Sequence, residues 1–422
     1  MPSHIKEEAQ SSPTNIETTN QKKIAWLQVL GAFCLNPRVV VIADLLCRGF
    51  LGTYGVYQTY YTTHVLRGFS ASAISWIGSV QGFFMFAFSF LNGPVFDAGH
   101  LRFLLLTGSF LSLLGCFLTS ICRYYWQILL AQGVAMGIGF GCLYLPAPAL
   151  VSMHFQRNQA LAMGISSSGS GIGAVIFPLV FTQLEPRIGF AWATRVLGFI
   201  LLALSVVPLA IMRFPKSPSG ALIDVSALHE PPFILLIGGL LTTFMGIYTM
   251  LYYINLFAVQ QTSANSNLTS SVLIIVNAAS TVGRILPSAV ADRIGPIHVL
   301  ATTALISGGL ALCLLAISHA ASIVVWAVVF GSTAGAFMGL PAAGVVSVSI
   351  SSERIGARLG MTLGVVGCGI LVAEPIAGAM LGDQETVWVG LIAWSADLMI
   401  AGGLFVCVAR VSKAGMNFFT VV

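Results

Sequence analysis

The stretch GISSSGSGIGAVIFP, residues 164–178, decides between two kinds of fold. Gly169, Gly171 and Gly173 are spaced like the glycines of a phosphate-binding turn, which lies between a strand and the helix that follows it. On one face of a membrane helix, the same small residues would instead let a neighbouring backbone approach closely. The sequence around the stretch distinguishes these two alternatives.

The composition places the chain in a lipid bilayer. Of its 422 residues, 57% are hydrophobic and 8% are charged, and the mean hydropathy is +0.91. A soluble domain carries about 25% charged residues, so a soluble globule of this composition would expose large apolar patches. A membrane-spanning helix needs about 20 apolar residues, and the length of the chain allows about twelve such helices.

Twelve apolar runs of about this length follow one another. They cover 26–61, 73–96, 101–121, 125–150, 159–183, 188–212, 233–258, 268–291, 296–317, 322–350, 356–381 and 388–411. The longest polar connection follows the sixth run. We therefore predict an all-α integral membrane protein with twelve transmembrane helices in two pseudo-symmetric six-helix halves. Its predicted parts are a disordered N-terminal tail (1–23), a first half (24–212), a linker (213–232), a second half (233–411) and a C-terminal tail (412–422).

The distribution of positive charge predicts the orientation. When the N-terminus is placed in the cytoplasm, twelve of the 19 Lys and Arg residues lie on the cytoplasmic side and four lie within apolar runs. The three on the external side are Arg67, Arg123 and Arg187. Cytoplasmic loops carry the excess of Lys and Arg, so both termini are expected in the cytoplasm. Residues 1–23 lack a signal-peptide pattern, and we expect a multi-pass protein of the plasma membrane.

The first run, from Trp26 to Tyr61, is too long for one crossing and contains charged residues. A charge at the centre of a bilayer costs a few kcal/mol or more. Asp44 and Arg48 stand four residues apart, which places them one helical turn apart. We therefore expect about 39–60 to cross the membrane, with these two side chains paired.

Glycine recurs at every fourth residue in the fourth run and again, 198 residues later, in the tenth. These stripes predict close packing of helix backbones, and so do two glycines of the fifth run. The predicted packing positions are Gly133, Gly137, Gly141, Gly169, Gly173, Gly331, Gly335 and Gly339. A nucleotide-binding turn requires a preceding strand, whereas residues 159–183 follow a basic loop and form an apolar run. The opening stretch is therefore predicted to be a packing surface.

A second motif also repeats between the halves. NGPVFDAGHLR (92–102) follows the second run, and PSAVADRIGP (287–296) follows the eighth, with their aspartates 195 residues apart. Acidic residues at helix ends can form contacts that open and close with a rocking motion, so we predict a gating role. A solvated loop acid is the simpler alternative. The gating motif comprises Gly93, Asp97, Arg102, Asp292 and Arg293.

These motifs resemble those of the major facilitator superfamily. More narrowly, the chain is similar to the monocarboxylate porter family, in particular its fungal branch. The similarity is carried by VYQTYY, SWIGSVQGFF, GPVFDAG, RYYWQILLAQGVAMGIG, FQRNQALAMGISSSGSGIGAVIFP, GFAWATRVLGFI and NAASTVGRILPSAVADRIG. The resemblance implies twelve helices, alternating access to a site near the middle of the membrane, and transport of small organic anions, often with a proton.

The resemblance also implies that an arginine of the eighth helix binds the substrate carboxylate, and here that residue is Arg284. The acidic residue that many members carry one turn earlier is replaced by Ser280, and the family's first-helix lysine is missing near Val56. The acidic opening motif of animal members is reduced to Ala25-Trp26, and Leu35–Arg48 is longer than the family pattern. These differences argue against lactate-like substrates and the usual proton coupling.

Several intramembrane polar residues are candidates for the site. An intramembrane charge is a functional candidate by default, although Arg284 could instead form a structural ion pair. Asn277, Tyr57 and Tyr54 are further candidates for substrate binding, with helix ties or an interfacial aromatic belt as alternatives. The candidates for proton coupling are Glu374, Asp397 and Asp44, each of which could also pair with an arginine or lie at an interface.

Other classes of function find no support in the sequence. The seven histidines form no metal-binding pattern and the eight cysteines form no CxxC pair, so no metal or cofactor is expected. An ATP-driven pump would need G-x-x-x-x-G-K-[ST], and no basic cluster with interleaved aromatic residues suggests nucleic acid. No set of catalytic residues suggests an enzyme. A receptor built on a transporter scaffold would need a longer cytoplasmic domain.

We therefore predict a secondary active transporter that works by alternating access. Its expected substrate is a small organic, carboxylated molecule, and the fungal resemblance favours export of a secondary metabolite. Proton-coupled uptake of simple monocarboxylates stays open as the alternative. The expected partners are this substrate, protons and the lipid bilayer, and the chain is expected to be a monomer. Asn267 is a candidate glycosylation site in an external loop.

Overall fold

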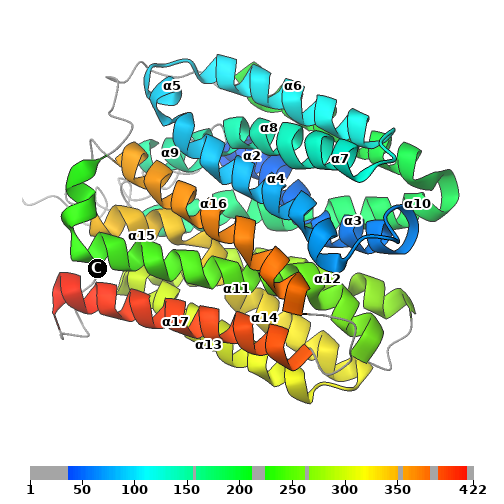
Figure 1. Ribbon diagram of the computed structural model, residues 1–422. Coiled ribbons are helices and arrows are strands. Elements are labelled where there is room, and N and C mark those ends of the chain that lie inside the picture. Colours follow the sequence, from blue (N-terminus) through cyan, green and yellow to red (C-terminus); the bar gives the residue numbers. More distant parts are fainter. Residues whose placement is uncertain are drawn as a thin grey trace, which may run out of the picture.

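The chain folds into a bundle of long helices (Figure 1). A computed structural model describes residues 37–154, 158–211, 224–261, 266–349, 355–380 and 388–415, and the regular structure of these residues is entirely helical. In Figure 1, α6, α7 and α8 lie along the upper edge, α13 and α17 lie along the lower edge, and α4 and α16 meet between them.

The first half contains six membrane crossings. The first crossing consists of α2 (Pro37–Asp44), η1 (Leu45–Gly49), α3 (Tyr54–Tyr60) and η2 (Tyr61–Val65). The second is α4 (Ala71–Leu91), which is followed by the short α5 (Gly93–Asp97), and the third is α6 (Leu101–Thr119). The fourth consists of α7 (Tyr125–Ile128), η3 (Leu129–Met136), α8 (Gly137–Tyr144) and α9 (Pro146–His154), and the fifth and sixth lie in α10 (Gln159–Ile211).

The second half repeats this arrangement. A short helix, η4 (Val225–His229), precedes the seventh crossing, α11 (Pro231–Gln261). The remaining elements are α12 (Ser266–Ile294), α13 (Pro296–Cys313) with η5 (Leu314–Ala316), α14 (Ala320–Gly339) with α15 (Pro341–Val348), α16 (Ile355–Met380) and α17 (Trp388–Ala414). Residues 224–230 and the C-terminal end of α17 lie at one end of the bundle, on the left in Figure 1. We call this the linker end and the opposite one the far end.

The twelve predicted crossings are found among the described residues. Ten of their helices are long and apolar enough to span a membrane. One of these ten, Gln159–Ala210, has 52 residues and is interrupted at Gly189, where φ is +77°, so it makes two crossings. Glycine adopts a positive φ at little cost, and this lets the chain turn at the far end. The broken helix from Pro37 to Val65 supplies the twelfth crossing.

The first crossing lies close to its predicted limits. Of the apolar run 26–61, about 39–60 was expected to cross the membrane, and the described helix runs from Pro37 to Val65, with residues 26–36 outside the described part. Inside it, Arg48 donates from Nε to Asp44 Oδ1 over 2.7 Å and from Nη2 to Asp44 Oδ2 over 2.5 Å. This two-bonded ion pair lets two charged side chains lie inside the bundle.

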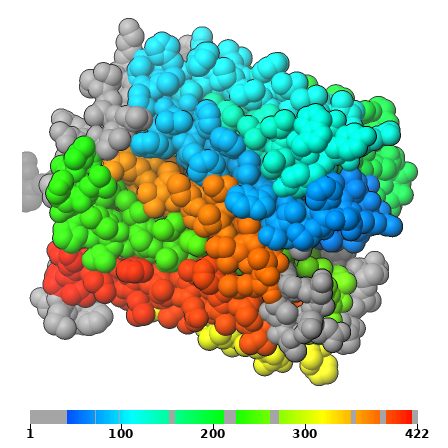
Figure 2. All heavy atoms as spheres, viewed as in Figure 1, coloured from blue at the N-terminus to red at the C-terminus, as the bar shows by residue number. Residues whose placement is uncertain are grey.

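The two halves meet along two helix pairs, α4 with α16 and α10 with α12. Figure 2 shows the first pair at the surface, where the blue α4 touches the orange α16. Glycine stripes hold the helices together inside each half. A Cβ built on Gly137 of α8 would lie 2.8 Å from the Gln81 carbonyl oxygen of α4, and one on Gly335 of α14 would lie 2.6 Å from the Ser280 Cα of α12. Matched glycines therefore serve matched contacts in the two halves.

The end of the linker is attached to the second half by buried charges. Arg358, near the start of α16, donates from Nε to Asp224 over 2.9 Å and from Nη2 to Glu230 over 2.6 Å. Its side chain is 2% exposed, and its guanidinium lies 5.4 Å from the centre of the Phe233 ring. These contacts fix residues 224–230 against the second half just before α11 begins.

We expect Gly335→Ala to destabilise the protein. The added methyl group would overlap the backbone of α12, and such overpacking costs about 1–3 kcal/mol. The matched control is Gly309→Ala in α13, where an added Cβ meets nothing within 4 Å. Thermal unfolding in detergent, followed by light scattering, should show a lower melting temperature for the first variant alone. Equal melting temperatures would contradict this view of the packing.

The Asp44–Arg48 pair leads to a second prediction. Asp44→Asn leaves Arg48 as an uncompensated charge inside the bundle, and breaking such a pair costs about 3–5 kcal/mol. The double variant Asp44→Asn with Arg48→Gln removes both charges and should recover most of this loss. The measurement is a double-mutant cycle of unfolding free energies in mild denaturant. Additive losses in the double variant would show that the two side chains do not depend on each other.

Candidate functional site

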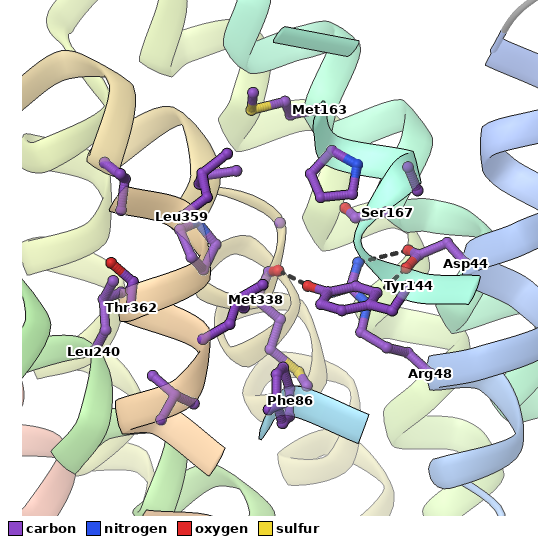
Figure 3. A pocket seen from close by; sticks show the side chains of 18 of the residues that line it. Asp44, Arg48, Phe86, Tyr144, Met163, Ser167, Leu240, Met338, Leu359 and Thr362 are labelled. Carbon is purple, nitrogen blue, oxygen red and sulfur yellow. Dashed lines mark hydrogen bonds and ion pairs between the residues drawn. The ribbon is translucent and has the colours of Figure 1, made fainter. Parts of the chain in front are cut away.

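A cavity of about 50 Å³ lies between the two halves, in the part of the bundle nearer the linker end (Figure 3). Residues of α2, η1, α4, α8, α9 and α10 line it from the first half, and residues of α11, α14, α15 and α16 line it from the second. Sites for drug-sized ligands measure about 300–1,000 Å³. The cavity is therefore nearly closed, and the halves must separate to admit an organic molecule.

Most of the cavity wall is apolar. Phe86, Leu240, Phe244, Leu359 and Val366 contribute hydrophobic side chains from both halves. The polar contribution comes mainly from one side of the cavity, where Figure 3 shows Asp44, Arg48, Tyr144 and Ser167 near one another. An apolar wall with a few polar groups on one side suits a hydrophobic molecule that carries one polar or charged group.

Arg48 is held in place at the cavity by three contacts. Besides the ion pair with Asp44, its Nη1 donates to the Met338 carbonyl over 3.4 Å, and its guanidinium lies 5.1 Å from the centre of the Tyr144 ring. Met338 belongs to the second half, so Arg48 also joins the halves. The carboxylate of Asp44 balances the guanidinium of Arg48, so the pair as a whole carries no net charge.

Arg284 lies directly behind the cavity wall, with 4% of its surface exposed. From α12 it reaches α10 of the first half, where Nη1 donates to the Ser167 carbonyl over 2.7 Å and to the Ser170 hydroxyl. Its Nη2 contacts the Met338 sulfur over 3.7 Å, and Nε has no hydrogen-bond partner. Ser167 and Met338 both line the cavity. The residue expected to bind substrate is thus adjacent to the cavity.

The charges around the cavity do not balance. Arg284 interacts electrostatically with Arg48 and Asp44, so the three charges belong to one cluster. Among the described residues, the ion pairs join Asp44 with Arg48 and Arg358 with Asp224 and Glu230, and none includes Arg284. The cluster therefore has two positive side chains and one negative side chain. A buried cation without a carboxylate partner favours binding of an anion.

Tyr54 and Tyr57 do not line this cavity. Both are buried in the first crossing, where the ring of Tyr57 lies 4.6 Å from that of Phe181 and the ring of Tyr54 lies 5.1 Å from that of Tyr252. Tyr252 belongs to α11, so the second contact joins the two halves. Both rings lie on the far-end side of the cavity, and the Tyr54–Tyr252 contact holds the halves together there. Neither a lipid-facing aromatic belt nor a cavity lining describes their positions.

The other polar candidates occupy different places. Asn277 is buried and donates from Nδ2 to the Ala174 carbonyl over 3.2 Å, so it joins α12 to α10. Glu374 is completely buried where α16 meets α4. Asp397 is exposed on α17, away from the cavity lining. The structure therefore brings Asp44 and Arg284 together and separates Glu374 and Asp397 from them.

The repeated loop motif forms a contact between the halves at the linker end. Asp292, at the end of α12, accepts hydrogen bonds from the backbone nitrogens of Ala160 over 2.9 Å and Leu161 over 3.0 Å. Its carboxylate thus caps the N-terminus of α10 in the first half. Arg102 and Arg293 are exposed, and Gly93 begins α5. The side chains of Asp97 and Asn267 lie outside those that the structure describes.

Some site residues could not be selected from the sequence. Tyr144, Met338 and Ser167 surround the two arginines, yet each stands in an apolar or small-residue helix without a distinguishing pattern. Arg48 was noted only as the partner of Asp44. Among the described residues, no group of three or more His, Cys, Asp or Glu side chains is arranged to hold a metal ion.

Known proteins are similar to this chain in sequence and in fold. The family model described as Major Facilitator Superfamily matches residues 24–351. The chain is 38% identical over 389 residues to the MFS-type transporter dbaD of Emericella nidulans, covering 92% of this chain and 86% of that one. It is 33% identical to the aspyridones efflux protein apdF of the same species, covering 90% and 76% of the two chains.

Two further comparisons agree with these. The agnestins efflux protein AgnL12 of Paecilomyces divaricatus is 34% identical, covering 87% of this chain and 85% of that one. The structure of FucP, a transporter solved in the outward conformation, superposes with a TM-score of 0.61 at 16% identity, covering 87% of this chain and 98% of that one. The matched family model and these relatives show that the chain belongs to the Major Facilitator Superfamily.

Proposed function

We propose that the chain is a secondary active transporter that exports a small organic metabolite with a negatively charged group. The observation that carries this proposal is Arg284 beside the cavity, a buried cation that belongs to none of the ion pairs among the described residues. A buried cation favours an anionic partner. The names of the aspyridones and agnestins efflux proteins support export of a secondary metabolite. A carboxylate is the anion expected from the resemblance to monocarboxylate porters.

The cavity wall favours a larger metabolite over a simple monocarboxylate. Phe86, Leu240 and Phe244 present apolar surface that a short hydrophilic acid would leave uncovered. Uptake of simple monocarboxylates with a proton is therefore the second candidate. We also propose membership of the monocarboxylate porter branch, a monomeric, non-enzymatic protein in the plasma membrane, and cytoplasmic termini, for which the asymmetry of Lys and Arg is the support.

In this proposal the halves rock about the cavity. The Asp292 cap holds the linker end closed, and the aromatic contact of Tyr54 with Tyr252 holds the far end closed. Each contact joins the two halves, so each must break when its end opens. With both contacts formed, the cavity is too small for a metabolite and corresponds to a closed state between the two open ones.

The test of the proposed substrate class compares acids with their methyl esters. A panel of aromatic carboxylic acids and their esters, salicylic acid and methyl salicylate among them, is screened by thermal stabilisation of the purified protein. Compounds that stabilise it are then followed as flux into proteoliposomes. We expect binding by acids only. Arg284→Ala should weaken it about tenfold to a hundredfold, because bonds to a charged group contribute about 1.5–3 kcal/mol.

The matched control for this test is Arg195→Ala. Arg195 is also an intramembrane arginine, but it bonds to Ser120 and does not line the cavity. Its substitution should leave acid binding unchanged. Esters that bind as well as their acids, or acid binding that survives Arg284→Ala, would contradict an anionic substrate at this site.

The gating role of Asp292 gives a separate prediction. Asp292→Asn weakens the cap on α10, and loss of a capping interaction costs about 0.5–2 kcal/mol. Hydrogen–deuterium exchange of the amides at Ala160 and Leu161 should become about twofold to thirtyfold faster. Asp397→Asn, a change of an exposed aspartate on α17, is the control and should leave this exchange unaltered. Unchanged exchange in Asp292→Asn would show that the cap does not hold the linker end closed.

A further inference from the structure

Glu374 is a buried acid that the substrate site does not use. It lies on α16 with 0% of its surface exposed, in the part of the helix nearer the far end. Ser79 of α4, in the opposite half, donates to its Oε2 over 3.1 Å. Its Oε1 has no hydrogen-bond partner among the residues that the structure describes. The carboxyl group is therefore only partly satisfied and lies at the boundary between the halves.

No positive charge compensates this acid within the described part of the chain. The titratable groups that face it are tyrosines: Tyr54 of the first crossing, and Tyr248, Tyr252 and Tyr253 of α11. From α4 it receives only the Ser79 hydroxyl, and none of the ion pairs of the described residues includes it. An ionised carboxylate in such a place has a large desolvation cost, whereas a protonated carboxyl group is neutral.

The contacts next to Glu374 close the far end of the α4–α16 interface. Ser72 of α4 donates to the carbonyl of Pro375 over 2.9 Å. One turn further along α16, a Cβ built on Gly378 would lie 2.8 Å from the Cα of Ser72, so the two helix backbones touch there. Separation of α4 from α16 at the far end would break these contacts and expose Glu374 to water. Access of protons to this acid is thus tied to the position of the halves.

One residue connects Glu374 with the substrate cluster. Tyr248 of α11 interacts electrostatically with Arg48, with Arg284 and with Glu374. A change of charge on Glu374 therefore changes the electrostatic environment of the side chain beside both arginines. Glu374 and the cluster of Asp44, Arg48 and Arg284 have different hydrogen-bond partners, but Tyr248 connects them electrostatically.

We propose that Glu374 is the proton-binding group through which a proton gradient drives the conformational cycle. When the far end opens, the carboxylate takes a proton from water and forms one O–H bond; the neutral group can then be buried as α4 closes on α16. Opening of the linker end then connects the buried group with water on the other side of the membrane, where the O–H bond breaks and the proton leaves. The restored carboxylate favours the open far end, and one proton crosses the membrane in each cycle. This inference deepens the proposed transport function by naming its coupling residue.

Infrared difference spectroscopy of the full chain in lipid tests the proposal without a substrate. A protonated carboxyl group in an apolar site has its own C=O stretching band, which disappears when the proton leaves. We expect this band in the wild type at acidic pH, its loss at alkaline pH, and its absence from Glu374→Gln. Glu374→Asp should shift its frequency. Absence of the band from the wild type, or an unchanged band in Glu374→Gln, would overturn the proposal.

Glu185→Gln is the matched control, because Glu185 is a partly exposed glutamate on α10 that leaves the α4–α16 interface untouched. This variant should keep the band of the wild type. Arg284→Ala should also keep it while losing the binding of carboxylic acids. Acid binding that survives in Arg284→Ala would reject the proposed substrate site. The carboxyl band would then still decide whether Glu374 binds a proton.

A distance measurement then tests the link to the conformational cycle. Spin labels on Ser70→Cys and Val389→Cys, both exposed at the far end, report the separation of the halves in a background with the native cysteines replaced. Raising the pH should move the wild type toward longer distances and leave Glu374→Gln at the short distance. A pH response that is the same in Glu374→Gln as in the wild type would overturn the role of this residue.

Discussion

A charged side chain inside the bilayer requires a partner, and this constraint organises the centre of the protein. Asp44 and Arg48 satisfy each other through two hydrogen bonds, so the first crossing can carry both charges. Arg284 is satisfied differently, by the Ser167 carbonyl and the Ser170 hydroxyl of the opposite half. These neutral partners hold its guanidinium without cancelling its charge. The protein thus keeps one positive charge available beside the cavity. The position of this charge is fixed by α10, which must move relative to α12 when the halves rock.

Backbone packing brings that charge to the boundary between the halves. A Cβ built on Gly283 of α12, the neighbour of Arg284, would lie 2.8 Å from the Ser332 Cα of α14, and one on Gly173 of α10 would lie 2.6 Å from the Leu45 carbonyl oxygen. Without side chains at these positions, α12 and α14 close behind Arg284, while α10 closes on the first crossing that carries Arg48. The glycines of the opening stretch therefore form a packing surface: their lack of side chains lets α10 lie against the crossing that carries Arg48, which lines the cavity, while Arg284 lies behind its wall.

The sequence predicts those features that depend on local spacing. Helix number follows from apolar length, and the Asp44–Arg48 pair follows from a separation of four residues. Contacts between distant segments could not be predicted from the sequence. Arg358 was counted only as a cytoplasmic charge, because its partner Glu230 is 128 residues away. Tyr54 and Tyr57 were candidates for the site because aromatic residues suit either a cavity or a membrane surface. In the structure they pack against Tyr252 and Phe181, contacts between distant segments that the sequence does not reveal.

The separation of the two clusters has a consequence for how coupling can work. A carboxylate repels an anionic substrate, so substrate and proton need different groups. Here Arg284 carries the unpaired positive charge and Glu374 carries the unpaired acid, on helices that contact the opposite half at different places, α10 and α4. Coupling between substrate and proton must then act through the conformation of the bundle and through Tyr248, which interacts electrostatically with Arg284 and with Glu374. A protonated Glu374 stabilises contact of α4 with α16, whereas an anion beside Arg284 neutralises the charge that the closed cavity leaves unpaired. In the proposed cycle, substrate and proton each favour closure by removing one uncompensated charge from the boundary between the halves, and these charges reappear when substrate and proton leave at opposite ends.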